Sequence, residues 1–277
     1  MDTNRKPDYV LGNAPDELGR LDRQAAAIAP ATRLLLQAAG VGPGMRVLDL
    51  GTGLGHVARM IGELVGPNGA VTGVDRSGEA LAIARERTKQ AGASHVSFLE
   101  GDITSWRGTQ QFDAIVERLV LFHVTDPVAV VRHHRQNLRH DGMFLAIDFD
   151  LGGLRTEPPV ETVTRALRWI VDAFAAAGAS PRIGARLGVI LEQAGLKNVT
   201  TFGVQPYAPP HDASSANLIS SVVRSLAPAI LQHGIATAED MDLPTLEQRI
   251  GEEVRLANAV VLMPTVAGAW GRTTVAN

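Results

Sequence analysis

The sequence predicts an α/β fold, doubly wound around a mainly parallel sheet. Between residues 46 and 150, short apolar runs typical of buried strands alternate with longer segments that have helical periodicity. Turn-forming clusters such as Gly66-Pro-Asn-Gly69 separate these segments. Strands and helices alternating at this spacing indicate right-handed βαβ units, whose strands pair in parallel.

Composition excludes several classes of protein. The chain has 277 residues, 45% of them hydrophobic and 20% charged, which suits a packed globule. A net charge of −3 does not favour nucleic acid as a partner. The sequence has no cysteine, which excludes disulfides, thiolate metal sites and cysteine nucleophiles, and we expect a cytoplasmic protein.

Neither a secretory signal nor a membrane span is expected. The first residues, MDTNRKPDYV, are polar and contain no apolar stretch of the kind a signal peptide needs. The longest apolar stretch, ANAVVLMPTVAGAW, is broken by Pro264 and is shorter than the roughly 20 residues that span a bilayer.

The N-terminal region is expected to be a tail over residues 1–8, followed by helical segments over 16–39. Pro30 predicts a division of that region into two helices, since proline disrupts a helix interior. The glycines and the proline at 40–44 predict that the helical region ends there. The apolar positions with helical spacing are Leu18, Leu21, Ala25, Ile28, Leu34, Leu35 and Ala38.

The alternating region predicts five strands and three helices. Ser77 suits the N-cap of the second helix, and Asp141-Gly142 suits a turn before the fifth strand. The strands are expected at 46–50, 70–74, 95–99, 112–117 and 143–148, and the helices at 54–65, 77–91 and 127–138.

The alternation stops after residue 150. Helices are expected at 156–178 and 182–194, the latter ended by Gly195, and a strand at 197–204. Further helices are expected at 216–226, 229–232 and 243–254, with a last strand at 266–271.

The stretch RVLDLGTGLGH, residues 46–56, combines a strand, a glycine-rich turn and the start of a helix. That geometry offers backbone N–H groups and a helix N-terminus to a ligand. The dinucleotide fingerprint G-x-G-x-x-G would place its third glycine where His56 stands. The charge of Asp49 at the strand end would also oppose a pyrophosphate, whereas a cationic ligand would tolerate it. An NAD-dependent oxidoreductase is therefore disfavoured.

The segment VLDLGTGLG resembles motif I of the class I S-adenosylmethionine-dependent methyltransferases. The resemblance continues through TGVDRS, Gly101-Asp102-Ile103, FDAIVERLVLFHVTD and LRHDGMFLAIDFD, where Met143 replaces a glycine of the family pattern. These motifs follow the family order over residues 46–150. The resemblance implies a Rossmann-like doubly wound sheet of seven strands, mostly parallel with the last strand antiparallel, and helical lid insertions.

The tail of the chain resembles one group of this family, the ubiquinone/menaquinone-biosynthesis type of small-molecule methyltransferase. The segments concerned are Tyr9-Val-Leu-Gly12, RIGARLGVILEQAGLKNV and VAGAWGR. We expect one methyltransferase domain over 1–277. It comprises an N-terminal helical arm (1–40), a cofactor-binding core (41–151), helical lid segments (152–181 and 206–256) and the C-terminal part of the sheet (182–205 and 257–277).

The resemblance implies S-adenosyl-L-methionine as cofactor and S-adenosyl-L-homocysteine as product. Asp49 would hold the turn amides or the ligand ammonium, Asp75 the ribose hydroxyls and Asp102 the adenine amino group. The full set of expected cofactor-binding residues is Asp49, Gly51, Thr52, Gly53, Gly55, Asp75, Arg76, Gly101, Asp102, Ile103, Glu117 and Arg118, with Leu54 beside them.

Three residues at the end of the fourth strand and just beyond it have candidate roles with alternatives. Glu117 and Arg118 would face the sulfonium region, where Arg118 pairs with the ligand carboxylate or with Glu117. His123 is the best-placed general base, because imidazole titrates near neutral pH, and a packed loop histidine is the alternative.

Roles outside the core are less specific. Glu17, Arg20 and Gln24 share a helix face that would touch the methionine end of the cofactor or lie at the surface. Tyr207, His211 and Trp169 would roof the acceptor site. His133, His134 and His140 suggest a solvated helix face, and no metal site is expected. The apolar helices 159–177 and 214–232 would form either a substrate lid or a homodimer interface.

The predicted function is methyl transfer to oxygen, nitrogen or carbon of a small, largely apolar molecule. The alanine, leucine, valine and isoleucine content of the lid segments suggests an apolar pocket. The alternatives are a non-methyl reaction on this fold, such as a cyclisation or decarboxylation, or a purely structural use of the cofactor. RNA methylation is disfavoured by the acidic balance and the lack of a basic aromatic patch.

Overall fold

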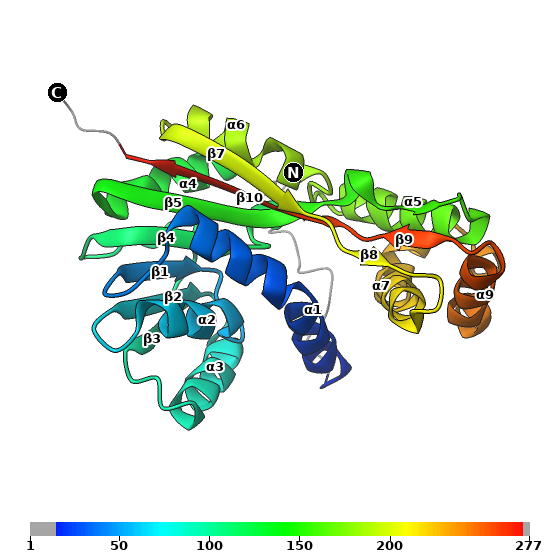
Figure 1. The fold of residues 1–277 in the computed structure, drawn as a ribbon, viewed down its shortest axis with the longest axis horizontal. Coiled ribbons are helices and arrows are strands. Elements are labelled where there is room, and N and C mark those ends of the chain that lie inside the picture. The colour runs from blue at the N-terminus through cyan, green and yellow to red at the C-terminus, as the bar shows by residue number, and fades with distance from the viewer. Residues whose placement is uncertain (1–14, 274–277) are drawn as a thin grey trace, which may run out of the picture. The chain divides into compact units, whose positions relative to one another are not determined.

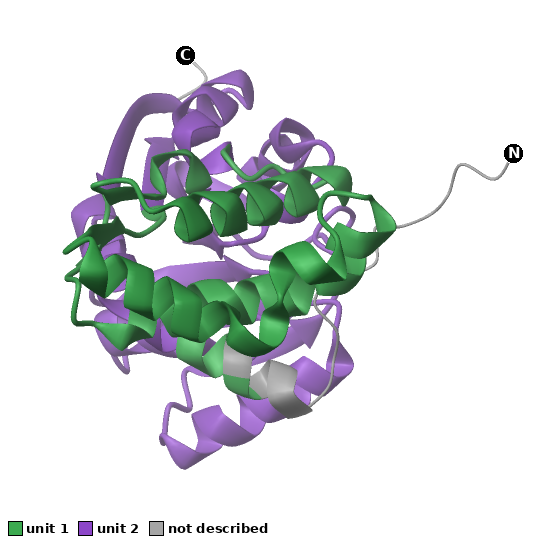
Figure 2. Cartoon of the chain, turned by 90° about the vertical axis from the view of Figure 1, so that its right-hand side faces the viewer, with its two compact units in different colours: residues 1–24, 150–182, 204–265 green, residues 25–149, 183–203, 266–277 purple. Residues whose placement is uncertain are grey.

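The structure, a computed structural model, describes residues 15–273, without the side chains of residues 15–18 and 20. The predicted tail and the Tyr9–Gly12 segment lie outside the described residues. The chain divides into two compact units (Figure 2). We call residues 25–149, 183–203 and 266–277 the sheet unit, and residues 1–24, 150–182 and 204–265 the helical unit.

The sheet unit contains a seven-stranded sheet with the order β3-β2-β1-β4-β5-β10-β7 (Figure 1). The first five strands in this order are parallel, and β10 runs in the opposite direction between β5 and β7. The predicted fold class is therefore confirmed. The bounds are β1 Arg46–Leu50, β2 Ala70–Asp75, β3 Val96–Glu100, β4 Phe112–Arg118, β5 Leu138–Asp150, β7 Lys197–Val204 and β10 Thr265–Arg272.

Helices α2, α3 and α4 connect β1 to β2, β2 to β3 and β4 to β5, whereas residues 101–111 join β3 to β4 without a helix. Ser77 caps α3 as expected, because its Oγ accepts the N–H of Ala80 at 3.2 Å. Asp126 caps α4 in the same way through the N–H of Ala129 at 2.8 Å. The helices are α2 His56–Val65, α3 Gly78–Gln90, α4 Pro127–His134 and α6 Leu187–Gln193.

Two prolines do not break their helices, contrary to expectation. Helix α1 runs unbroken from Pro15 to Ala39 through Pro30, and α7 runs from Ala213 to Gln232 through Pro228. A proline removes one backbone N–H and crowds one carbonyl, which buried side chains on both sides of it can offset. Such side chains flank both prolines: Ala25, Ile28, Leu35 and Leu36 in α1, and Leu226, Ala227 and Ile230 in α7.

The region between α4 and β5 also differs from the prediction. Helix α4 ends at His134, followed by one 3₁₀ turn, and β5 already begins at Leu138 opposite Phe112. The next pair is Met143 with Ala114, so the expected turn at Asp141-Gly142 lies inside β5 as an irregularity. Asp141 adopts the left-handed backbone conformation there, with φ of 57°.

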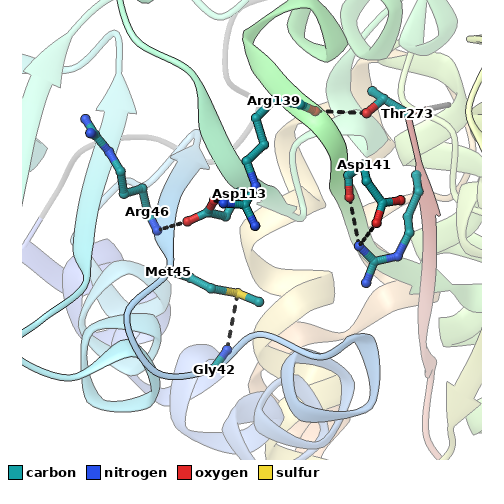
Figure 3. A network of polar contacts seen from close by, with 8 residues as sticks. Gly42, Met45, Arg46, Asp113, Arg139, Asp141 and Thr273 are labelled. Atoms are coloured by element: carbon teal, nitrogen blue, oxygen red, sulfur yellow. Dashed lines mark hydrogen bonds and ion pairs between the residues drawn. The ribbon is translucent and has the colours of Figure 1, made fainter. Parts of the chain in front are cut away.

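A polar network holds this irregular part of β5 (Figure 3). Asp113 accepts the backbone N–H of Arg46 at 2.6 Å and forms an ion pair with Arg139. Thr273 donates its hydroxyl hydrogen to the carbonyl of Arg139 at 3.0 Å. These residues lie near the start of β1 and β4 and the end of β10, so the network stabilises the sheet away from the carboxyl ends of the parallel strands.

The helical unit contains three long packed helices, one short helix and a small antiparallel sheet. Its elements are α5 Glu161–Ala176, α7, α8 Ala238–Met241 and α9 Leu243–Leu256, with β6 Arg155–Glu157, β9 Val260–Leu262 and β8 Tyr207–Ala208 in the order β6-β9-β8. Strands of two or three residues carry too little periodicity to be recognised in the sequence, and none of the three was expected.

The apolar faces of α5, α7 and α9 are buried inside the helical unit. The two helices that the sequence offered as a lid or a dimer interface, α5 and α7, pack against each other, and α9 packs against both. The buried side chains include Val163, Ala166, Ile170, Ile219, Val223, Ile230, Leu246, Ile250 and Val254. Among the described helices, none is long and apolar enough to cross a membrane.

Candidate functional site

Four polar residues from the sequence prediction lie where neighbouring strands end. Asp102 follows β3, Asp75 ends β2, Asp49 precedes the last residue of β1, and Arg118 ends β4. Parallel pairing brings these ends to one edge in the order β3, β2, β1, β4. The connections leave β1 and β4 in opposite directions along the sheet, and ligands of open α/β sheets bind at such a switch point.

The glycine turn after β1 requires glycine for two different reasons. Gly51, Gly53 and Gly55 have φ of 66°, 51° and 71°, a region that other residues rarely adopt. A Cβ at Gly51 would lie 2.4 Å from Cγ2 of Val120, so that glycine also allows close packing. A Cβ at Gly53 would meet no atom within 4 Å, so the space beside Gly53 is open.

Four backbone N–H groups of this turn are already occupied. Gly51 and Thr52 donate to the carbonyl of Val74 at 2.8 and 3.0 Å, and Gly53 donates to Oδ2 of Asp75 at 2.8 Å. Gly55 donates to the carbonyl of Thr52 at 2.9 Å. The expectation that the turn offers its N–H groups to a ligand is therefore wrong for these four residues. The turn contributes close approach of the backbone instead.

Asp75 uses both carboxylate oxygens to organise the chain around it. Oδ2 accepts from Gly53, and Oδ1 accepts the N–H of Ser77 at 2.9 Å. Each carboxylate oxygen has a second lone pair, so Asp75 can still accept from ligand hydroxyls. Arg76, the next residue, is exposed.

Asp49 is a buried carboxyl with a strongly shifted titration. Its side chain is 1% exposed and accepts the hydroxyl hydrogen of Thr52 at 2.6 Å. Burial raises the pKa of Asp49 to about 7, although the Thr52 bond and the positive charge of Arg118 both oppose that shift. Near neutral pH this carboxyl therefore exchanges readily between its charged and neutral forms.

Arg118 is a partly exposed cation without an acidic partner. Its guanidinium donates to Oγ1 of Thr32 at 3.2 Å, and no described carboxylate forms an ion pair with it. Burial lowers the pKa of Arg118 to about 10, and the charge of Asp49 opposes that shift. Thr32 is fully buried in α1, where its hydroxyl also donates to the carbonyl of Ile28 at 2.9 Å. The alternative of an ion pair between Glu117 and Arg118 is wrong.

Glu117 instead supports the loop that follows β4. Its Oε2 accepts the N–H groups of Val120 and Leu121 at 3.2 and 3.3 Å. Asp148, on the adjacent strand β5, accepts the N–H of Phe122 at 2.9 Å. Burial raises the pKa of both carboxyls, that of Asp148 to about 7, and the charge of Asp148 raises the pKa of Glu117 further. Since Oε1 of Glu117 is buried without a hydrogen-bond partner, we expect Glu117 to be protonated and neutral.

His123 lies at the end of this supported loop. It closes the 3₁₀ turn Leu121–His123, and its ring packs edge-on against Phe122 with 5.0 Å between centroids. Burial lowers the pKa of His123, and the positive charge of Arg76 lowers it further. The imidazole is therefore neutral at pH 7, which is the state that a general base requires.

The loop after β3 carries Asp102 and Ile103. Oδ1 of Asp102 accepts the backbone N–H and the hydroxyl hydrogen of Thr104, at 2.9 and 2.7 Å. His134 of α4 donates from Nε2 to the carbonyl of Ile103 at 2.6 Å. His134 is fully buried, so the prediction that it belongs to a solvated face is wrong. Gly101 lies under the indole ring of Trp106, whose Cδ1 would be 2.4 Å from a Cβ at Gly101.

The residues expected around the acceptor lie in the helical unit. Trp169 is buried on α5 with the guanidinium of Arg165 5.3 Å from its ring centre, whereas Tyr207 is 64% exposed. His211 is exposed. Their role in substrate binding stays a prediction. The side chains of Glu17 and Arg20 lie outside those the structure describes, and no set of described His, Asp and Glu side chains could hold a metal ion.

Sequence analysis missed Thr32 and Asp148 and misjudged His134. Each is a polar residue at a position where the local pattern is apolar, as Asp148 is within the run FLAIDFD. A polar residue buried in such a pattern needs a partner, and this was the signal available in the sequence. The partner itself, Arg118 in the case of Thr32, is 86 residues away and is visible only in the fold.

Comparison with known proteins identifies the family. A family model described as "Methyltransferase domain" matches residues 42–181, which are 140 of the 277 residues. The chain therefore belongs to this methyltransferase family. Together with the strand order of the sheet, this makes it a class I S-adenosylmethionine-dependent methyltransferase. Membership of the ubiquinone/menaquinone-type group stays a prediction, and no curated protein matches the chain significantly in sequence.

Solved structures share the fold at low sequence identity. The YcgJ protein from Bacillus subtilis is 18% identical, with a TM-score of 0.60 over 89% of this chain and 99% of its own. A phosphoethanolamine N-methyltransferase from Haemonchus contortus, solved with S-adenosylhomocysteine, is 16% identical, with a TM-score of 0.56 over 88% of this chain and 52% of its own. The [4+2]-cyclase SpnF is 17% identical, with a TM-score of 0.52 over 89% of this chain and 81% of its own.

Proposed function

We propose that this methyltransferase binds S-adenosylmethionine along the carboxyl edge of its sheet and methylates a small, largely apolar acceptor. The observation that carries the proposal is the order of polar groups on that edge. From β3 to β4 it presents Asp102, Asp75, Asp49 and Arg118. The cofactor is an extended molecule that presents an adenine amino group, ribose hydroxyls and, beyond the sulfonium, the ammonium and carboxylate of its amino-acid group.

The spacing of these groups suits an extended ligand. Neighbouring strands lie about 4.8 Å apart, so the three intervals from β3 to β4 span roughly 14 Å. In this arrangement Asp102 serves the adenine amino group and Asp75 the ribose hydroxyls. Asp49 then serves the ammonium, and Arg118 the carboxylate, which a guanidinium recognises well.

The donor set also argues against a phosphate-bearing ligand. Pyrophosphate sites at glycine turns depend on free backbone N–H groups. Four N–H groups of this turn are occupied, one of them by the carboxylate of Asp75. A turn surrounded by acidic side chains suits a cation, so a nicotinamide dinucleotide is disfavoured.

The protein's part in methyl transfer is mainly positioning. The cofactor, when bound, supplies an electron-poor methyl group and a neutral leaving group. The residues of the edge hold the ligand's two ends, which fixes the reactive centre between them. The carboxyls of Glu117 and Asp148 hold the loop that carries His123. If the acceptor is a hydroxyl or phenol, neutral His123 accepts its proton.

The first experiment separates the two ends of the ligand. We expect Arg118→Met to weaken S-adenosylhomocysteine binding at least tenfold and Thr32→Val to weaken it roughly fivefold, because a hydrogen bond to a charged group contributes about 1–3 kcal/mol. Both variants should bind 5′-methylthioadenosine as the wild type does, since that compound lacks the amino-acid carboxylate. Isothermal calorimetry measures both affinities for the wild type and for each variant.

A matched control tests whether Thr32 acts through Arg118. Thr164→Val removes a hydroxyl that bonds the carbonyl four residues earlier, as Thr32 does, but in helix α5 of the helical unit. That variant should bind both ligands normally. Equal loss of both ligands in Thr32→Val would contradict the proposed carboxylate site.

The acceptor is identified by turnover. Incubation of the wild type with S-adenosylmethionine and panels of phenols, amines and carbon acids should release S-adenosylhomocysteine with at least one apolar member. A second candidate function is a non-methyl reaction, because one solved structure that shares this fold at 17% identity is described as a [4+2]-cyclase. Product formation without release of S-adenosylhomocysteine would support that candidate instead.

A further inference from the structure

Two adjacent histidines of α4 contact the loop that carries Asp102. We define the loop as residues 101–106. His134 donates from Nε2 to the carbonyl of Ile103 at 2.6 Å, and His133 donates from Nε2 to the carbonyl of Trp106 at 2.8 Å. A carbonyl can only accept, so both rings carry their proton on Nε2. The two bonds attach the middle and the end of the loop to one helix.

The rings of this cluster reinforce the attachment. The indole of Trp106 stacks on His134 with 6.3 Å between centroids and an interplanar angle of 26°. His133 packs edge-on against His134 at 4.9 Å. The indole also covers Gly101, where any side chain would collide with it. The indole of Trp106, at the end of the loop, therefore packs both on Gly101 at the start of the loop and on His134 of α4.

Within the loop, Asp102 is the residue most constrained by this attachment. Its carbonyl accepts the N–H groups of Ser105 and Trp106 at 3.0 and 2.7 Å, so it closes a tight turn. The next residue, Ile103, is the one bound by His134. A shift of the Ile103 carbonyl therefore moves the backbone of Asp102 directly.

The supporting helix is itself rigidly placed. Asp126 caps its N-terminus, and Val130 and Val131 are buried. Burial lowers the pKa of His134 to about 4. The ring therefore stays neutral at physiological pH, and a change of pH in that range does not alter its hydrogen bond to the carbonyl of Ile103. Besides the indole of Trp106, the ring of His133 faces His134, and Nδ2 of Asn137 lies 3.5 Å from Nδ1 of His134.

We propose that His134 and His133 are positioning residues that set the purine specificity of this methyltransferase by fixing the loop over the adenine site. The inference rests on the proposed function, because it assumes that Asp102 accepts from the adenine amino group. An adenine has that amino group at position 6, whereas hypoxanthine has an oxygen there, which a carboxylate repels. A fixed loop discriminates between the two bases, and a loosened loop does not.

The test compares the affinities of S-adenosylhomocysteine and S-inosylhomocysteine by calorimetry. The wild type should prefer the adenosyl compound by about tenfold or more, the factor that one hydrogen bond of ordinary strength contributes. His134→Leu keeps the volume but removes the donor, and should reduce that preference at least threefold. His134→Gln keeps an amide donor and should restore most of it.

Two further variants make the result decisive. His140→Ala changes an exposed histidine of the same region and should leave the preference unchanged. His133→Leu changes the less buried ring, so it serves if His134→Leu does not fold, and it should also reduce the preference. An unchanged preference in folded His134→Leu or His133→Leu would overturn the inference.

Failure of the underlying function gives a different result. If the wild type binds neither compound, the proposed cofactor site is wrong and the inference falls with it. If the wild type binds both equally well, the cofactor site stands and only the inference about the loop is overturned.

Discussion

At the scale of single residues, the site depends on titratable groups that burial has shifted toward neutral pH. Asp49 is the clearest example, because its pKa of about 7 places it between charged and neutral forms under ordinary conditions. Glu117 and Asp148 are shifted in the same direction by the same cause. The charge of a buried carboxyl depends on whether a cation lies beside it, whereas a surface carboxyl stays charged with or without a ligand.

Ligand affinity should therefore depend on pH through Asp49. The ammonium of S-adenosylhomocysteine favours the ionised carboxylate, whose fraction rises about tenfold from pH 6 to pH 8 for a pKa near 7. We expect the association constant to rise by a similar factor, with proton release on binding below pH 7. Calorimetry at several pH values measures both. In Asp49→Asn, binding should be weaker and this dependence should vanish; a persisting slope would point to another group.

Burial lowers the pKa of His123 most, and the charge of Arg76 lowers it further, so Arg76 should shift the acid limit of any reaction that uses His123. Arg76 lowers the pKa of His123 by repelling its protonated form. Arg76→Gln removes that repulsion, so the pKa of His123 should rise toward its ordinary value. In a methylation assay the acid limb of the kcat/KM profile should move to higher pH. The matched variant Arg107→Gln changes another exposed arginine and should leave the limb in place.

At the scale of elements, the turn after β1 and the loop after β4 pack directly against each other. Val120, in the loop that Glu117 and Asp148 hold, occupies the space where Gly51 would otherwise carry a side chain. The position of each segment consequently depends on the other. Close packing of this kind transmits a change in one segment to the next.

Substitutions at two glycines should separate packing from ligand contact. Gly51→Ala brings a methyl group within 2.4 Å of Val120 Cγ2 as well as a strained φ, so we expect a loss of roughly 2–3 kcal/mol in the free energy of unfolding. Gly53→Ala has open space, so it should lose only about 1 kcal/mol, the cost of a left-handed alanine. Urea unfolding measures both.

The same pair of variants should affect ligand binding in the opposite order. The methyl group of Gly53→Ala enters the open space beside the turn and should impair S-adenosylhomocysteine binding directly. Adding Val120→Ala to Gly51→Ala should recover part of the lost stability. If it does not, the backbone strain at Gly51 outweighs the collision with Val120.

At the scale of the whole molecule, the ligand that fits the site should stabilise the folded protein, and a ligand that does not fit should leave its stability unchanged. S-adenosylhomocysteine at 100 times its dissociation constant should raise the free energy of unfolding by about 2.7 kcal/mol. NAD⁺ at the same concentration should change nothing, because the N–H groups that a pyrophosphate needs are occupied. Thermal unfolding with each ligand is the measurement, and stabilisation by NAD⁺ alone would contradict the cofactor assignment.

The sequence by itself determined the parallel core and the positions of the acids on it. Strands of five or more residues between glycine-rich turns leave a strong local pattern, which is why β1, β2, β4 and β7 were placed to within a residue or two. The motif acids follow from the same pattern, since each stands where a predicted strand ends. Both signals are local in the chain, so no knowledge of the tertiary structure was needed.

Only the tertiary structure decided which hydrogen-bonding groups have a partner within the protein and which remain available to a ligand. The turn amides bond Val74 and Asp75, Arg118 meets Thr32, and His134 meets Ile103, each across at least 20 residues of chain. Local patterns also failed at Pro30 and Pro228, where buried neighbours offset the cost of a proline. The hydrogen-bond partners and the burial of a residue depend on what packs against it. The residues that pack against it come from distant parts of the chain, so the local sequence does not reveal them.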